Sequence, residues 1–133
     1  MAYEFSRNQA DANLEVTGTL AQGGVNTSAI DLEQEIGGDI ENIVGQIDIP
    51  AVAGITGAKV LTFALEDSAD GSSFAAVDPA VSTTVTGAGG SGTSAKDARF
   101  RFPPATRRYV RIAQTADASS GTFSGDVTFR ILT

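Results

Sequence analysis

The chain has 133 residues, enough for one domain that buries a core of its own. It contains no cysteine, histidine or tryptophan, which excludes disulfides and histidine-dependent catalysis and argues against an aromatic platform for sugars or bases. The formal net charge is −7, from 16 acidic and 9 basic residues. No segment has the pattern of a signal peptide or the ~20 apolar residues of a membrane span, so we expect a soluble chain.

Residues 1–26 are polar and weakly periodic. They predict an N-terminal arm that is partly extended and is held in place by packing or by a partner. Within it, residues 13–20 could pair as an edge strand. The remainder of the chain, residues 27–133, is predicted to form one domain.

The first half of that domain contains short patterns of alternation. Residues 28–36 alternate apolar and acidic side chains, as a half-buried strand does. Residues 39–44 could form a single helical turn with Asp39 as its cap. Residues 46–52 predict a second strand, with Pro50 at its edge or end because proline donates no ladder hydrogen bond.

The clearest pattern lies in residues 59–77. Apolar side chains alternate with smaller or polar ones over residues 60–66, which predicts a strand with one buried face. Asp70 and Gly71 then supply a tight turn, with glycine taking the positive φ angle, and residues 74–77 begin the returning strand.

The rest of the chain predicts further short strands separated by turns. Residues 87–94 are a Gly/Ser-rich stretch that predicts a flexible loop, and Lys96 is not placed as in a phosphate-binding loop. The predicted strands lie at residues 80–86, 98–102, 107–115 and 121–132. Roughly eight strands without a convincing helix predict an all-β fold, an antiparallel β-sandwich or jelly roll, with a single closed barrel as the alternative.

The densest group of carboxylates is Glu66, Asp67 and Asp70. Their spacing does not match a calcium loop, and Asp70 is better explained as a residue that forms the turn. No other pair of acids is marked out as a glycosidase pair. We therefore expect no enzyme, no metal site and no cofactor.

The charges are unevenly distributed. Residues 1–95 carry thirteen acidic and two basic residues, a balance of −11, whereas residues 96–133 carry three acidic and seven basic residues, a balance of +4. Complementary docking patches and ordinary solvated strand faces are both open interpretations. The net acidity disfavours general nucleic-acid binding.

The basic part alternates arginine with aromatic residues. The arginines are Arg99, Arg101, Arg107, Arg108 and Arg111, and the aromatics are Phe100, Phe102 and Tyr109. We favour aromatics in the core and arginines outside, as partner-binding candidates that meet acidic residues of a neighbouring copy such as Asp31, Glu33 and Glu35. A single-stranded nucleic-acid binder would instead need all five arginines in one exposed stripe.

Several segments, in order, carry a resemblance to a known family. They are Phe5-Ser6-x-x-Gln9-Ala10, Ser28-Ala29-Ile30-Asp31-Leu32, Leu65-Glu66-Asp67-Ser68-x-Asp70-Gly71-x-x-Phe74, Phe100-x-Phe102-Pro103 and Arg107-Arg108-Tyr109-Val110-Arg111. Together they resemble the capsid cement, or decoration, proteins of tailed bacteriophages, of the type found in a Bordetella podophage.

The resemblance implies a jelly-roll structural protein on the outer surface of a virion capsid, made in the host cytoplasm. It implies a homo-oligomer, a dimer at local two-fold axes or a trimer at local three-fold axes, that clamps adjacent subunits of the phage major capsid protein. Neither nucleic acid nor membrane is an expected partner. We expect the arm to order on a neighbour, and its partner-binding candidates are Tyr3, Phe5, Arg7 and Gln9.

The alternative is a carbohydrate-binding or adhesin-type β-sandwich module on a virion or cell surface. That alternative predicts saccharide binding, with Tyr109 or Phe123 exposed in a groove. The capsid interpretation predicts self-association and affinity for assembled shells only.

Overall fold

The computed structural model describes residues 10–32, 44–52, 54–55, 57–87, 92–117 and 123–132, with backbone alone for residues 10–13. These residues contain ten strands and no helix, hence no helix that could cross a membrane. The helical turn predicted at 39–44 lies outside them except for Val44, which begins a strand.

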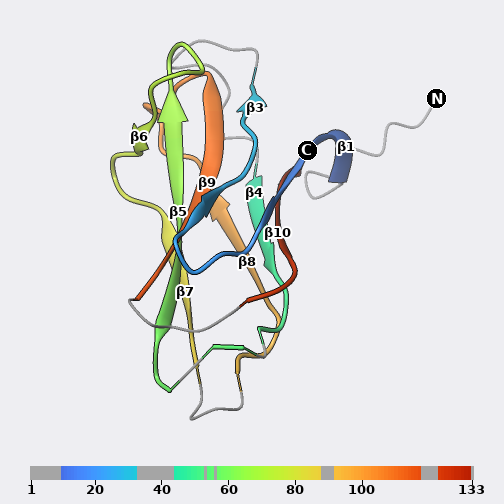
Figure 1. Ribbon diagram of the computed structural model, residues 1–133. Coiled ribbons are helices and arrows are strands. Elements are labelled where there is room, and N and C mark those ends of the chain that lie inside the picture. The colour runs from blue at the N-terminus through green and yellow to red at the C-terminus, as the bar shows by residue number, and fades with distance from the viewer. Residues whose placement is uncertain are drawn as a thin grey trace, which may run out of the picture.

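The strands form two antiparallel sheets (Figure 1). Sheet A has the order β1 (Ala10–Thr19), β10 (Asp126–Leu132), β4 (Val44–Ile49) and β8 (Lys96–Arg101). Sheet B has the order β2 (Val25–Asn26), β9 (Tyr109–Ala116), β5 (Val60–Ser68) and β6 (Ala75–Ala76). In addition, β3 (Ile30–Asp31) pairs with β9, and β7 (Ser82–Thr86) pairs with β5.

This strand order is that of a jelly roll. Strands β2 and β3 both pair with β9, and together they occupy one strand position of sheet B. In the same way, β6 and β7 both pair with β5 and occupy one position. The chain then visits the two sheets in the jelly-roll sequence, with its first and last strands paired at one side of sheet A. The prediction of an all-β antiparallel sandwich is confirmed.

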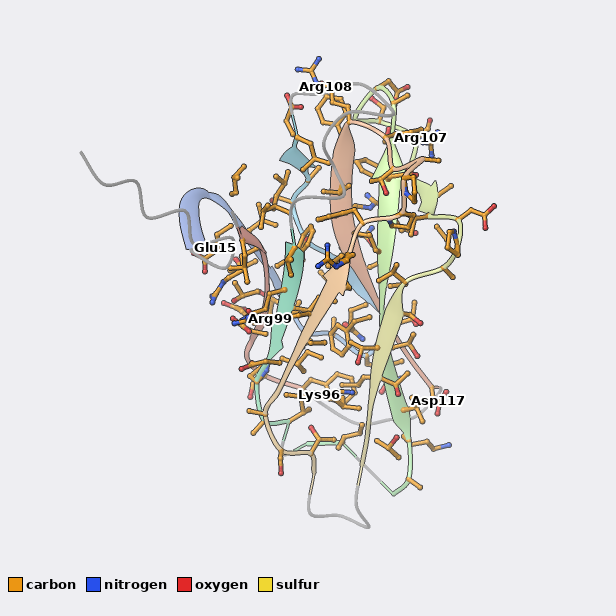
Figure 2. All side chains as sticks on the ribbon, turned by 180° about the vertical axis from the view of Figure 1, so that it is seen from behind. Glu15, Lys96, Arg99, Arg107, Arg108 and Asp117 are labelled. Atoms are coloured by element: carbon orange, nitrogen blue, oxygen red, sulfur yellow. The ribbon has the colours of Figure 1, made fainter. Side chains whose placement is uncertain are left out.

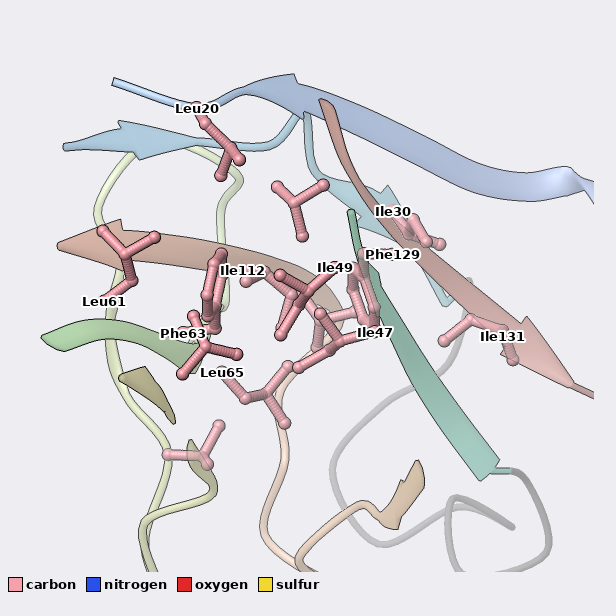
Figure 3. Close-up of a cluster of buried hydrophobic side chains, with 14 of the residues drawn as sticks. Leu20, Ile30, Ile47, Ile49, Leu61, Phe63, Leu65, Ile112, Phe129 and Ile131 are labelled. Carbon is pink, nitrogen blue, oxygen red and sulfur yellow. The ribbon is translucent and has the colours of Figure 1, made fainter. Parts of the chain in front are cut away.

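The core of buried hydrophobic side chains lies between the sheets (Figure 3). Along β5, β9 and β10, buried side chains alternate with more exposed ones. On β5 the buried residues are Leu61, Phe63 and Leu65, each at most 1% exposed, as their spacing predicts. Residues of sheet A face them, chiefly Ile47, Ile49, Phe129 and Ile131. Burying each such side chain contributes about 1.5–3 kcal/mol relative to leaving it exposed.

The hairpin predicted at residues 59–77 is present. It consists of β5, a turn in which Gly71 has a φ of 80°, and the short strand β6. The strand predicted at 28–36 is described only to Leu32, and its paired part is β3.

Part of the predicted arm belongs to the sandwich. Strand β1 pairs with β10 at the edge of sheet A, which confirms the edge strand expected there. Leu14 and Val16 pack against the core and Leu20 is buried in it. These three apolar side chains explain why residues 14–20 follow the sheet.

Candidate partner-binding surfaces

The five predicted arginines do not form one stripe. Arg99 and Arg101 lie on β8, at the edge of sheet A, whereas Arg107, Arg108 and Arg111 lie at one end of sheet B, on and just before β9. Figure 2 shows the two groups apart: Arg107 and Arg108 lie at the top of the view, and Arg99 lies well below them. The four candidates in the arm, Tyr3, Phe5, Arg7 and Gln9, lie outside the described residues.

Arg107 is bound to Asp67, a carboxylate on β5 whose side chain is only 7% exposed. The guanidinium donates from Nε and Nη2 to Oδ1 of Asp67, at 3.1 and 2.8 Å, and the backbone N–H of Arg107 donates to Oδ2 at 2.9 Å. The hydrogen bonds that the guanidinium donates to this nearly buried carboxylate raise the pKa of Arg107. The pair therefore fixes the loop before β9 onto the end of β5.

Arg111 and Arg108 are held in the same way. Arg111 lies opposite Glu66 across β9 and β5, donates to it at 2.8 Å, and its guanidinium carbon lies 4.0 Å from the centre of the Phe74 ring. Arg108 donates to both carboxylate oxygens of Asp31, at 2.7 and 2.8 Å. These pairs, with Arg107–Asp67, form what we call the arginine cluster of sheet B.

The partners within this cluster were not evident from the sequence. We expected acidic residues such as Asp31 to meet the arginines of a neighbouring copy, but Asp31 binds Arg108 of its own chain. Glu33 and Glu35 lie outside the described residues. Only the register of β3, β5 and β9 brings these charges together, since they are 40 or more residues apart in the chain.

Asp70 forms the turn between β5 and β6. Its Oδ1 accepts hydrogen bonds from the backbone N–H groups of Ser72 and Ser73, at 2.8 and 3.0 Å, and from the Ser68 hydroxyl at 2.8 Å. The backbone donors at Ser72 and Ser73, followed by the Ser68 hydroxyl, lower the pKa of Asp70 from 3.8 to about 2. The carboxylate serves the turn, and the described residues contain no group of three or more acidic, histidine or cysteine side chains suited to a metal ion.

The outer face of sheet A carries a second charged network, which we call the polar ladder. Arg130 on β10 binds Glu15 on β1 at 2.9 Å and Asp48 on β4 at 2.8 Å. Gln46 on β4 donates to Asp48 at 2.6 Å and accepts from Nε of Arg99 on β8 at 2.9 Å.

At the β8 end of the polar ladder two carboxylates face each other. Asp97 lies opposite Asp48 across β8 and β4. A hydrogen bond with Asp48, together with the repulsion between the two negative charges, raises the pKa of Asp97. Sequence reading did not single out these residues, although Asp48 alternates with Ile47 and Ile49 along β4 and therefore faces outward.

The aromatic side chains of the described residues are packed against protein. The Tyr109 ring has Gly71 against it and the Arg108 guanidinium 5.3 Å from its centre. Phe123 packs against the core, and Phe100 stacks on Phe129 and meets Phe102 edge-to-face. Tyr109 and Phe123, the two side chains that a sugar-binding module would expose, are both half-buried.

No protein-family model matches the chain, and no curated protein is similar to it in sequence. Among solved structures, it is similar to the CBM22-1 and GH10 modules of Clostridium thermocellum endo-1,4-β-D-xylanase 10B complexed with xylohexaose, with a TM-score of 0.44 and 10% identity. That match covers 92% of this chain and 27% of the xylanase chain. It is also similar to the xylan-binding module CBM15, with a TM-score of 0.35, 15% identity and 91% of each chain covered. Both likenesses concern the fold and identify no ligand.

Proposed function

We propose that this chain is a structural virion protein that binds the outer surface of a phage capsid and clamps adjacent major capsid protein subunits. It acts as a homo-oligomer and catalyses no reaction. Each bound copy adds interface area that must be lost before neighbouring subunits separate. Because it binds the assembled shell in preference to free subunits, it stabilises the shell by mass action.

The observation that carries this proposal is the arginine cluster of sheet B. Three of the segments that resemble capsid cement proteins, residues 28–32, 65–74 and 107–111, meet there through three ion pairs. The residues in these pairs are the ones that the resemblance marks: Asp31 with Arg108, Glu66 with Arg111 and Asp67 with Arg107. The convergence of these three segments at one end of sheet B is the observation that supports the proposal.

The sandwich also suits a clip. Strand β1 forms one edge of sheet A, and residues 1–9 precede it. A segment that leaves an edge strand can add to the sheet or surface of a neighbour with its backbone hydrogen bonds. We therefore propose the arm as one contact with the shell, with Tyr3, Phe5, Arg7 and Gln9 as its candidate contact residues.

The test is co-sedimentation with empty shells of the phage whose capsid gene lies beside this one. We expect saturable binding of the full chain at a fixed ratio to the major capsid protein, and no binding to unassembled subunits. Deletion of residues 1–12 should abolish retention on the shells while circular dichroism still reports a folded sandwich.

Unchanged occupancy by the deletion variant would refute the role of the arm, and failure of the full chain to bind shells would refute the proposal itself. In the second case a glycan array tests the carbohydrate-binding alternative directly.

A further inference from the structure

Strand β8 is an edge strand with an unusual arrangement of charge. Among the described strands it pairs with β4 alone, so its other side has no strand partner there. Asp97, Arg99 and Arg101 point outward from it, and Lys96, Ala98 and Phe100 point toward the inside of the sandwich. Lys96 reaches across to donate to the carbonyl oxygen of Thr84 on β7, at 2.9 Å.

The charges at this edge are only partly compensated within the chain. Asp97 lies opposite Asp48, a like charge, which is unfavourable between directly facing residues of a strand pair, and the positive charges of Arg130 and Arg99 offset the repulsion only in part. Arg99 donates from its Nε to the side-chain oxygen of Gln46, a neutral partner. At this edge, therefore, the Asp97 carboxylate has no cation directly opposite it on β4. The Arg99 guanidinium lies on the same face, two residues further along the strand.

We infer that β8 is the edge along which two copies of this chain pair, antiparallel and symmetric about Ala98. The two copies then form one continuous sheet across the dimer. This inference deepens the homo-oligomer part of the proposed function, and rests on that proposal for the role of the dimer on a shell.

The register follows from charge. In an antiparallel strand pair, directly facing side chains lie on the same side of the sheet. When the two strands belong to identical copies related by a two-fold axis perpendicular to the sheet, one residue must therefore face the same residue of the other copy, and the axis passes between those two residues. Centred on Arg99, the dimer would place Asp97 of each copy opposite Arg101 of the other, but it would also place two guanidinium groups directly opposite each other at the axis, which is destabilising. Centred on Ala98, it places Asp97 of each copy opposite Arg99 of the other, and small side chains meet at the axis.

The same register suits the inner row of side chains. It places Phe100, which is half-buried at this edge, opposite Lys96 of the second copy. The aliphatic stem of a lysine covers apolar surface while its ammonium group stays in water. Both rows of β8 are therefore complementary to themselves in the register centred on Ala98, which sets no like charges opposite each other.

The first test is a charge swap, measured by analytical ultracentrifugation without shells present. The wild-type chain should dimerise reversibly. Asp97→Arg sets like charges opposite each other twice in the dimer and should weaken it by roughly tenfold or more. The double variant Asp97→Arg with Arg99→Asp restores both facing pairs and should restore the affinity, whereas Lys59→Glu, away from β8, should leave it unchanged.

The second test uses the absence of cysteine from the chain. Directly facing residues of an antiparallel pair have Cα atoms about 4.5–5.5 Å apart, within the range that a disulfide spans. Ala98→Cys should therefore form a disulfide-linked dimer rapidly under mild oxidation, and Thr84→Cys, on β7, should not.

A wild-type chain that stays monomeric, an unaffected Asp97→Arg dimer, or Ala98→Cys that links no faster than Thr84→Cys would each overturn the inference. The charges on β8 would then serve only to keep the edge from pairing. Because these measurements contain no shells, their failure leaves the capsid-binding result of the proposed function to stand or fall separately.

Discussion

The nearly buried ion pair between Arg107 and Asp67 should be a main support of the end of sheet B. Replacing Arg107 with alanine removes both guanidinium hydrogen bonds to the Asp67 carboxylate and leaves the bond from the backbone N–H of residue 107. A carboxylate that is 7% exposed then loses its counter-charge.

The expected cost follows from that geometry. Removing one partner of a buried ion pair costs about 3–5 kcal/mol, because the other charge stays desolvated. The hydrogen bond from the backbone N–H of residue 107 to Asp67 remains. The Arg107 side chain is also 34% exposed, so the ion pair is only partly buried. We therefore expect the lower end, about 3 kcal/mol, which lowers the melting temperature of a chain of this length by roughly 10 °C.

The matched control is Arg108→Ala. Arg108 and Asp31 also form a two-point ion pair, but their side chains are 48% and 35% exposed. An exposed pair contributes about 0–1 kcal/mol. Urea unfolding, followed by circular dichroism, gives both free energies of unfolding. Equal losses for Arg107→Ala and Arg108→Ala would refute the argument that burial decides the strength of the cluster.

Two further predictions test local packing and a turn. Gly45→Ala would drive a Cβ into the Phe100 ring and should destabilise the fold by about 1–3 kcal/mol. Gly23→Ala, whose added Cβ has no atom near it, should be close to neutral. Thermal melts of both variants check this. The Asp70 carboxylate should titrate near pH 2 by NMR, and since its pKa is lowered on folding, its contribution to stability is present above its unfolded pKa of 3.8 and is lost as the pH falls toward 2. A midpoint for Asp70 near 3.8 would mean that the turn hydrogen bonds do not hold in solution.

The fold was largely predictable because strand alternation is a local property. The inward row of β5 and the Asp70-Gly71 turn were visible in the sequence, since each depends on residues next to one another. Strand β1 was harder to place, because few apolar side chains mark it and its pairing with β10 joins the two ends of the chain.

The surfaces were less predictable because they depend on register between distant strands. Nothing in the sequence around Arg107 indicates that its partner is Asp67, 40 residues earlier. The polar ladder was missed for the same reason, since Arg130 meets Glu15 and Asp48 only when three strands align. Residue types thus indicated charge on the outside, and only the topology decided which charges pair.

The most direct test of a capsid-clamping role is the disruption temperature of purified empty shells, measured with increasing amounts of the added chain. We predict that the temperature rises with occupancy and reaches a plateau when the sites are filled, because the bound chain must be lost before subunits separate. Shells that bind the chain and still disrupt at an unchanged temperature would contradict clamping, and shells that do not bind it would contradict the proposal as a whole.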